Sequence, residues 1–335
     1  MMELEGCSLL KQLSNRALQE VCGYLLVLEF RIGFNYCHKP ARSDKLISLS
    51  YQEKKMSNPI QSRREFLRRA SALGVSAIIP LETALAQSRK VDRVGLQLYT
   101  LRQEMAADFE GTLQKVAELG YKEMQFAGYY GRSPQQVRDL LGRLGMSSPA
   151  AHVGLNLIRE DLGKQIDIAL EIGQSYIVVP SVPQNERTLS DFEGHAKALN
   201  EAGEKCKEAG LSIAYHNHSF EFESQRGRTG YDQLLDLTDP ELVSFELDLY
   251  WAVNANINPI TLFRDNPGRF PMVHVKDRNS AGEMTDVGRG EIDFAEIFSH
   301  SETAGIKHYF VEHDFPEDGL DSVAYSINSL SNIYF

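Results

Sequence analysis

Short runs of apolar, β-prone residues alternate with amphipathic stretches along the chain from Val91 onward. The runs have the length of buried strands, and the stretches between them repeat apolar residues at helical spacing. Several of these stretches end in glycine, as in FEGTLQKVAELG, which is typical of a helix C-terminus. The eight predicted strands span residues 93–100, 121–128, 146–154, 175–182, 211–218, 242–250, 270–277 and 307–314.

One short motif recurs at four of these helix-to-strand junctions, as AELGY, GRLGM, KEAGL and ETAGI. Eight strand–helix units in roughly 250 residues are the dimensions of a (β/α)8 TIM barrel, an α/β fold that forms a single domain. A doubly wound open sheet is the alternative, but no glycine-rich phosphate turn follows the first strand. We therefore expect residues 87–335 to form a barrel that carries the catalytic site.

Residues 56–86 have the features of an export signal peptide. Arg63 and Arg64 precede Phe-Leu, a short apolar run follows, and an Ala-Leu-Ala cleavage motif ends at Ala86. The paired arginines indicate twin-arginine (Tat) export, with the Tat translocase as a transient partner and a periplasmic mature protein. The apolar run is shorter than the roughly 20 residues that cross a bilayer, so we expect no stable membrane insertion after cleavage. A basic surface helix is the alternative interpretation.

Residues 1–55 precede this signal, although Met56 stands where an export signal would begin. The segment shows no sustained periodicity, and we interpret it as a non-native N-terminal extension from an upstream start codon. Of the four cysteines only Cys206 follows the signal, so we expect no intramolecular disulfide in the mature domain.

The chain is acidic, with a formal net charge of −11. Because residues 1–86 carry more basic than acidic side chains, the mature domain is more acidic still. Binding to a nucleic-acid backbone requires a basic surface, so we expect no nucleic-acid partner. The charge is better matched to a small-molecule substrate that is neutral or chelates a metal.

Polar residues gather at the C-terminal ends of the predicted strands, which is where TIM barrels place their chemistry. These residues are Gln97, Tyr99, Gln125, His152, His216, His218, Asp248, His274, Lys276, Glu312 and Asp314. Four of them, His216, Asp248, His274 and Glu312, come from the fifth to the eighth strand in turn, so their side chains should converge. Two imidazoles and two carboxylates suit a first-row divalent ion such as Mn2+, Zn2+, Co2+ or Fe2+ better than Mg2+. For each residue taken singly, a polar group that caps a strand is the alternative.

Period-two alternation supports this convergence. It places His216 and His218 on one face of the fifth strand, and Asp248 on the same face of the sixth strand as Glu246 and Tyr250. In the last two strands, His274 shares a face with Lys276, and Glu312 shares a face with Asp314.

Six motifs carry a family resemblance: GLQLYTLR, YHNHSFEF, LDLYWAV, VHVKD, GRGEIDF and FVEHD. Together, in this order, they resemble the xylose-isomerase-like TIM-barrel superfamily of sugar (phosphate) isomerases and epimerases, which is related to AP endonuclease family 2. The likeness covers about residues 91–332. It implies one divalent metal held by Asp248, His274 and Glu312, with His216 where relatives have glutamate. His218 is the alternative ligand from that strand.

The resemblance also implies a reaction. It predicts a keto-sugar isomerase or epimerase that acts through a metal-stabilised enediolate, with Glu312 as acid/base and Lys276 near the oxyanion. The group at the opposite face is His216 or a residue that is not a ligand, such as Glu221. A histidine at position 216 favours enolisation over symmetric epimerisation, so a lyase acting on an oxidised (keto) glycoside is the first alternative. A non-catalytic sugar-binding barrel is the second alternative. The acidic charge and the lack of a three-metal histidine set disfavour an endonuclease.

Five residues are predicted to contact the substrate: Gln125, His152, His218, Tyr250 and Trp251. A core histidine at position 152, plain packing of the two aromatic residues, and a salt bridge of Lys276 to Asp248 or Asp314 are the alternatives. Because the Tat route exports folded proteins, the metal could be acquired in the cytoplasm, which makes Mn2+ the preferred ion. We interpret GRGEID as a turn and helix start rather than a phosphate site.

Overall fold

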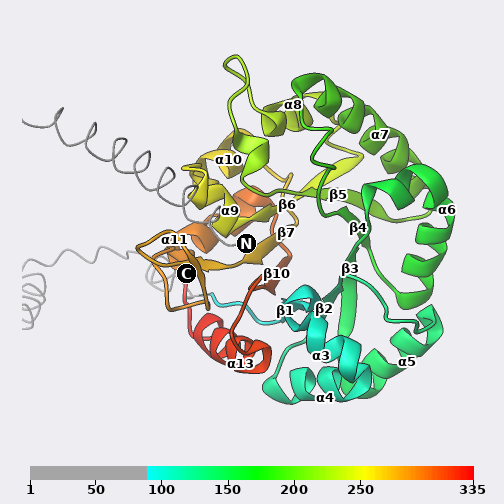
Figure 1. Ribbon diagram of the computed structural model, residues 1–335, viewed down its shortest axis with the longest axis vertical. Helices are drawn as coiled ribbons and strands as arrows, with labels where there is room; N and C mark the ends of the chain where they lie inside the picture. The colour runs from blue at the N-terminus through cyan, green and yellow to red at the C-terminus, as the bar shows by residue number, and fades with distance from the viewer. Residues whose placement is uncertain (1–88) are drawn as a thin grey trace, which may run out of the picture. The chain divides into compact units, whose positions relative to one another are not determined.

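The computed structural model describes residues 89–335, so the predicted extension (1–55) and export signal (56–86) lie outside the described residues. Within that range the eight predicted strands form a closed parallel barrel in the order β1-β10-β7-β6-β5-β4-β3-β2 (Figure 1). Pairing of β1 with β10 closes the ring, which confirms the barrel and excludes the open sheet. The strands are β1 (Val94–Gln97), β2 (Glu123–Phe126), β3 (Ser147–His152), β4 (Tyr176–Val179), β5 (Ser212–His216), β6 (Val243–Asp248), β7 (Met272–Val275) and β10 (His308–Val311).

Helices surround the ring of strands (Figure 1). They are α3 (Arg102–Ala107), α4 (Phe109–Leu119), α5 (Pro134–Leu144), α6 (Leu155–Ile172), α7 (Leu189–Glu208), α8 (Gly230–Leu237), α9 (Leu249–Asn254), α10 (Pro259–Asp265), α11 (Phe294–Ser299), α12 (Ser301–Ala304) and α13 (Gly319–Leu330). Two 3-10 turns, η2 (Leu98–Leu101) and η3 (Phe220–Phe222), follow β1 and β5. None of the helices in residues 89–335 has the length and apolar character needed to cross a membrane.

The recurring glycine motif ends helices, as predicted. Gly120, Gly145 and Gly305 are C-caps of α4, α5 and α12, with φ of 107°, 66° and 83° in the left-handed region that glycine adopts without strain. Gly210 follows the C-cap Ala209 of α7 with φ 78°. Each motif therefore stops a helix and turns the chain into the next strand.

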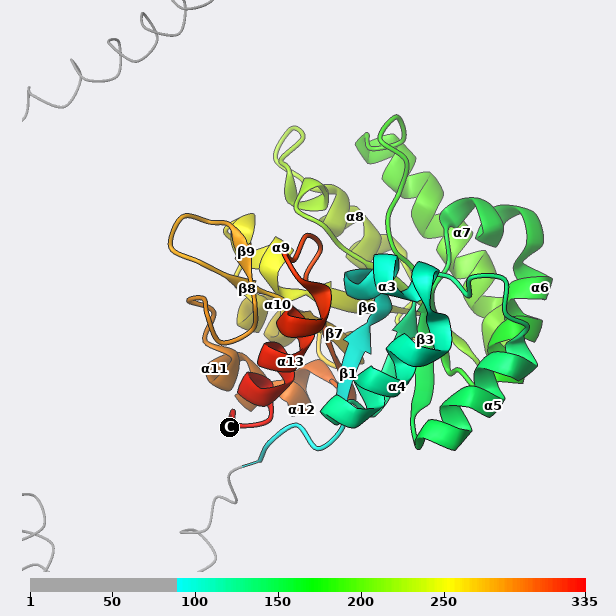
Figure 2. The same ribbon diagram turned by 60° about the horizontal axis from the view of Figure 1, so that its bottom comes forward.

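A short hairpin of β8 (Asp277–Arg278) and β9 (Met284–Thr285) extends the chain beyond β7. Figure 2 shows this hairpin on the side to which β1 points, while the C-terminus lies toward the other side. Asp277 holds the following loop, because its carboxylate accepts hydrogen bonds from the backbone N–H groups of Gly288, Gly290 and Ile292. The GRGEID motif is therefore architectural, as we interpreted it.

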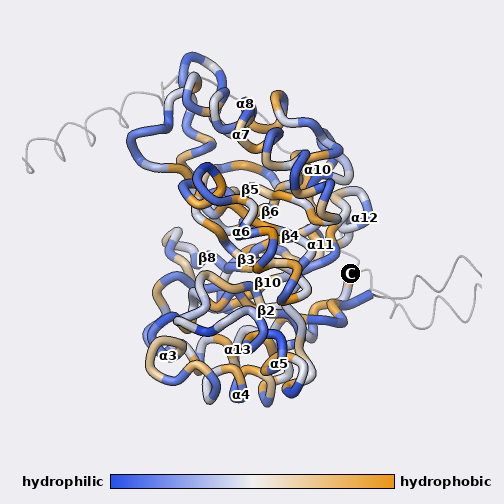
Figure 3. Tube along the Cα trace, turned by 90° about the vertical axis from the view of Figure 1, so that its right-hand side faces the viewer, coloured by the Kyte–Doolittle hydropathy of each residue, from blue (hydrophilic) through white to orange (hydrophobic). Residues whose placement is uncertain are grey.

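The barrel interior is filled by side chains at three levels. At the base, Glu123 pairs with Arg93 at 3.0 Å and with His308 at 2.7 Å. Above it lies a buried apolar cluster of Ala150, Tyr176, Val178, Ala214, Met272 and Phe310. The apolar character of the strands is visible along the trace in Figure 3. The polar strand-end residues lie above this apolar cluster. There the β5–β6 pairing aligns His216 with Glu246, and the β6–β7 pairing aligns Asp248 with His274.

Candidate metal centre and active site

Three of the predicted metal ligands meet at the ends of β6, β7 and β10. His274 Nδ1 lies 2.7 Å from Glu312 Oε2 and 3.9 Å from Asp248 Oδ2. All three side chains are buried, and their donor atoms lie within 4.8 Å of one another. The arrangement brings two carboxylates and an imidazole to one point, as the strand-end positions predicted.

His216 joins this group from β5. Its Nε2 lies 3.8 Å from Asp248 Oδ2, and its other ring nitrogen, Nδ1, lies 3.3 Å from Glu246 Oε2. The structure thus places all four predicted ligands together, with the two histidines each facing a second carboxylate below.

That second carboxylate, Glu246, is the site residue that our prediction missed. Its Oε2 lies 2.8 Å from His152 Nε2 and 3.1 Å from His274 Nε2, and its Oε1 accepts a hydrogen bond of 2.6 Å from Gln125 Nε2. The side chain is fully buried. Alternation had already placed Glu246 on the face of Asp248, which was the one signal available in the sequence.

Lys276 lies among three carboxylates. Its Nζ is 2.9 Å from Asp248 Oδ2, 2.7 Å from Glu312 Oε2 and 2.8 Å from Asp314 Oδ1. Burial alone would lower the pKa of the amine, but the three carboxylates raise it well above the ordinary value, so the side chain is an ammonium. The salt-bridge alternative therefore holds for both Asp248 and Asp314, and the charge lies directly beside the predicted acid/base.

The ionisable groups differ sharply in their proton affinity. Burial opposes ionisation of Glu312, yet Lys276 and His274 hold the pKa of its carboxyl well below the ordinary range. Burial raises the pKa of Asp248 to about 6 even though the Lys276 ammonium opposes the shift. His274 would lose its proton through burial alone, but Glu246 and Glu312 raise its pKa to about 10. Burial, followed by the charge on His274, lowers the pKa of His216 well below its usual value.

Several buried polar atoms at this end of the barrel have no hydrogen-bond partner among residues 89–335. They are His216 Nδ1, His218 Nδ1, Asp248 Oδ2 and Trp251 Nε1. Asp248 Oδ2 does have an ionic contact with Lys276, but its geometry is not that of a hydrogen bond. Unpaired buried polar groups are costly, and a ligand bound at this end of the barrel would pair those of His218, Asp248 and Trp251.

Two of these atoms belong to predicted substrate contacts. The His218 ring lies 5.7 Å from the Trp251 ring and 5.2 Å from the His216 ring. Burial, followed by the charge on Lys276, lowers the pKa of His218 to about 3, so its imidazole is neutral. The free nitrogen of the neutral His218 ring can accept or donate a hydrogen bond, depending on its tautomer, and the Trp251 indole N–H can donate one. Both groups suit the hydroxyls of a sugar.

The other predicted contacts are engaged within the protein. The Tyr250 hydroxyl donates to the Gly282 carbonyl at 3.1 Å, which ties α9 to the β8–β9 hairpin. Gln125 is fully buried, and its amide bonds Gln97, Glu246 and His274. His152 is half-buried, stacks on the His274 ring at 5.2 Å and bonds Glu246.

The donor set fits a divalent first-row metal. Atoms that bind one such ion lie about 3 Å from one another, which is close to the separations of the Asp248, His274 and Glu312 donors. A second group, His152, His216, Glu246 and His274, also brings its donor atoms within 4.8 Å. Both groups use His274, through different ring nitrogens.

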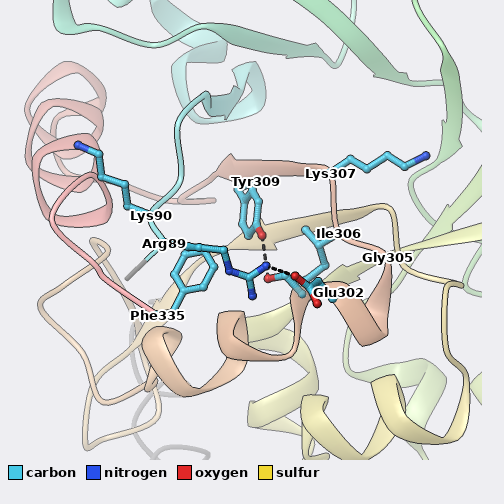
Figure 4. A pocket seen from close by; sticks show the side chains of 9 residues that line it. Arg89, Lys90, Glu302, Gly305, Ile306, Lys307, Tyr309 and Phe335 are labelled. Carbon is cyan, nitrogen blue, oxygen red and sulfur yellow. Dashed lines mark hydrogen bonds and ion pairs between the residues drawn. The ribbon is translucent and has the colours of Figure 1, made fainter. Parts of the chain in front are cut away.

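A separate pocket of about 370 Å3 lies at the opposite end of the barrel, near the start of the described chain. Arg89, Glu302, Tyr309 and Phe335 line it, and an Arg89–Glu302 ion pair spans it (Figure 4). Backbone hydrogen bonds join Arg89 to Phe335 in both directions. Since TIM barrels place their chemistry at the C-terminal strand ends, this pocket is not a candidate catalytic site.

Known proteins match this chain along most of the barrel. The family model described as "Xylose isomerase-like TIM barrel" matches residues 113–331. An inosose dehydratase of Geobacillus kaustophilus (strain HTA426) is 27% identical over 206 residues, which are 54% of this chain and 66% of that protein. Inosose dehydratase 2 of Bacillus cereus is 27% identical over 173 residues, 45% of this chain and 57% of that protein. The match therefore spans less than two thirds of the length of these two relatives.

A solved structure gives a fuller match. The crystal structure of a sugar phosphate isomerase/epimerase from Parabacteroides distasonis ATCC 8503 has a TM-score of 0.63 and 28% sequence identity. The match covers 75% of this chain and 97% of that chain.

Proposed function

Because the chain belongs to the xylose isomerase-like TIM barrel family, we propose that it is a metal-dependent lyase acting on a keto-sugar or keto-glycoside. The enzyme removes the proton next to the carbonyl and expels the substituent on the following carbon. The products are an unsaturated ketone and an alcohol or water. Enolisation, the first half of this reaction, is shared with the isomerase or epimerase that the sequence motifs first suggested.

The choice of elimination rests on one observation: the two groups that flank the site, Glu312 and His216, differ in their ability to transfer a proton. Glu312 is a carboxylate beside an ammonium, whereas its counterpart at the end of β5 is His216, an imidazole whose pKa burial lowers well below the usual value. Epimerisation by proton exchange needs an acid/base on each face of the enolate, but elimination needs one well-placed base. The site therefore supports elimination better.

The residues divide the chemistry as follows. A divalent metal at Asp248, His274, Glu312 and His216, when bound, would polarise the carbonyl and stabilise negative charge on its oxygen. Glu312 takes the proton from the carbon next to the carbonyl, and the electron pair of that C–H bond moves toward the carbonyl. The electrons then return to form the C=C bond and expel the leaving oxygen, which receives the proton from Glu312.

Other side chains hold the substrate and charge. The Lys276 ammonium lies 2.7 Å from Glu312 Oε2, where it can stabilise the enolate oxygen. His218 and Trp251 offer their unpaired ring nitrogens to substrate hydroxyls. The names of the two relatives support a dehydration, since both are called inosose dehydratase.

An isomerase or epimerase is the second candidate. The structural match named sugar phosphate isomerase/epimerase favours it, and the shared enolisation step makes it chemically close. It requires that a second group return the proton, and His216, at the end of β5, is the candidate for that role.

Export and metal choice remain part of the proposal. We propose that the mature enzyme is periplasmic and binds Mn2+ before export. Zn2+, Co2+ and Fe2+ are the alternatives, because the same imidazole and carboxylate ligands also bind these ions.

The test uses a keto-glycoside with a nitrophenyl leaving group, incubated in D2O with the metal-loaded protein. A lyase releases nitrophenol and yields an unsaturated ketone with strong ultraviolet absorbance. An isomerase or epimerase incorporates deuterium and changes the sugar without releasing nitrophenol, which would refute elimination. Neither change, together with measurable binding, would identify a sugar-binding barrel. Glu312→Gln is the control, because it removes the base while keeping a side chain of the same shape.

A further inference from the structure

Glu246 lies beneath the predicted ligands, fully buried, and has no part in the reaction proposed above. We propose that Glu246 is a positioning residue that orients the two histidine ligands from below. In this arrangement one carboxylate sets which nitrogen of His274 and His216 faces the metal. The inference rests on the metal centre of the proposed function, but not on the reaction that occurs there.

The orientation of His274 is fixed by two oxygens on one side of its ring. Its Nε2 lies 2.6 Å from Gln125 Oε1 and 3.1 Å from Glu246 Oε2. Both ring nitrogens of His274 face acceptors, so each carries a proton when no metal is bound. Nε2 donates to Gln125 and Glu246 below, whereas Nδ1 faces the predicted ligands Glu312 and Asp248 and is the nitrogen whose proton a metal would replace.

A chain of amides determines which atom of Gln125 is the oxygen. The backbone N–H of Tyr99 donates to Gln97 Oε1, so Gln97 Nε2 must be the donor to Gln125 Oε1 at 2.8 Å. Gln125 Nε2 is then the donor to Glu246 Oε1 at 2.6 Å. Because a backbone N–H can only donate, the direction of every bond in this relay follows from Tyr99.

His216 is placed by the same carboxylate oxygen. Its Nδ1 lies 3.3 Å from Glu246 Oε2, close but without hydrogen-bond alignment, and its Nε2 faces Asp248 Oδ2 at 3.8 Å. Both histidines thus direct one nitrogen down to Glu246 and the other up to the predicted metal. Carboxylates that hold metal-binding histidines in this way commonly set both ring orientation and ligand basicity.

His152 completes the surroundings of Glu246. Its Nε2 lies 2.8 Å from Glu246 Oε2, and its ring stacks on that of His274 with an interplanar angle of 16°. A fully buried carboxylate is stable only when its oxygens are paired, and here both are. The same residues could instead bind an ion directly, with Glu246 as a ligand, and the experiment separates the two cases.

The experiment titrates the full-length protein with Co2+ in the absence of substrate. The readouts are the visible spectrum of the bound ion and its affinity in competition with a chelator. We expect Glu246→Gln to bind one Co2+ with a changed spectrum and roughly 10- to 100-fold weaker affinity. The matched control is Glu123→Gln, a buried carboxylate paired with His308 at the base of the same barrel, which should leave both readouts unchanged.

A second variant guards against misfolding of the first. Gln125→Met keeps Glu246 but removes one acceptor from His274 Nε2, and should weaken Co2+ binding in the same direction by a smaller factor. Wild-type spectrum and affinity in Glu246→Gln would overturn the proposal. So would loss of binding in Glu246→Gln together with normal binding in Asp248→Asn, because Glu246 would then be a ligand. Absence of Co2+ binding to the wild type would overturn the metal centre itself, whereas bound Co2+ without turnover would count only against the lyase.

Discussion

The Lys276 ammonium lies 2.7 Å from Glu312 Oε2, just beyond the ends of the paired strands β7 and β10. Asp248 and Asp314 complete its surroundings at 2.9 Å and 2.8 Å. The buried positive charge therefore balances a group of carboxylates that would otherwise repel one another.

Lys276→Met should destabilise the metal-free protein by about 3–5 kcal/mol, because it leaves buried carboxylates without their partner. Mn2+ should restore part of that loss, since a cation at the same oxygens replaces the missing charge. Urea unfolding in EDTA and in Mn2+ measures both effects. Lys307→Met, at an exposed position, is the control and should change neither value. Equal destabilisation with and without Mn2+ would contradict this account.

Glu312→Gln should reduce exchange of the substrate proton next to the carbonyl by roughly 10²- to 10⁴-fold, because it removes the proposed general base. The measurement is deuterium incorporation or release of the leaving group under saturating keto-sugar. Asp314→Asn offers a comparison, since Asp314 also pairs with Lys276 but lies outside the predicted ligands, and its loss should be much smaller. Equal losses in the two variants would argue that charge balance, rather than proton transfer, is the role of Glu312.

Glu221 should make stability depend on pH. Burial raises the pKa of its carboxyl from the ordinary 4.5 to about 7, although hydrogen bonds from Tyr215 and the His218 N–H oppose the shift. The folded protein thus binds this proton more tightly than the unfolded chain does. The resulting stability is complete below about pH 4.5 and is lost as the pH rises through about 7, a change of about 3 kcal/mol.

Glu221→Gln has no proton to lose, so its stability relative to the wild type should rise by about 2.5 kcal/mol between about pH 5 and about pH 8. Urea unfolding at the two pH values, in EDTA, gives the comparison. Losing the hydrogen bond from the His218 N–H lowers the stability of the variant equally at both pH values. Only the change in relative stability between the two pH values therefore tests the pKa of Glu221. Parallel behaviour of the two proteins would show that Glu221 is ionised throughout.

Gly290→Ala should destabilise the protein by about 1–3 kcal/mol through overpacking. A Cβ at this position would lie 2.2 Å from Asp277 Oδ1, the carboxylate that holds the loop after β7. Gly194→Ala, in α7, is the matched control: its Cβ meets nothing within 4 Å, and alanine favours the helix by up to about 1 kcal/mol. Thermal unfolding of both variants tests the contrast, and an unchanged Gly290→Ala would mean that the loop can move away at no cost.

Much of the barrel could be predicted because its signals are local. Strand runs, glycine helix ends and alternation each involve a few neighbouring residues, and the strand ends placed His216, Asp248, His274 and Glu312 together. The strands came out shorter than predicted because their terminal residues leave the ladder for loops.

The role of Glu246 could not be predicted, because it depends on contacts across the barrel. His152 on β3 and Glu246 on β6 are 94 residues apart in the chain and 2.8 Å apart in space. Alternation says that Glu246 points inward, but the stagger of the strands decides which inward residues share a level. For Lys276 the sequence offered Asp248 or Asp314 as partners, but it could not show that both would pair with the ammonium together with Glu312.

The filled barrel interior determines how substrate enters and product leaves the site. The apolar cluster around Phe310 and the Glu123 ion pairs below it close the barrel under the site. Substrate must therefore arrive through the mouth, and product must leave by the same opening. In the proposed elimination, a released alcohol or unsaturated ketone that stays in the mouth would occupy the place of the next substrate. Turnover should then slow as product accumulates, in competition with fresh substrate.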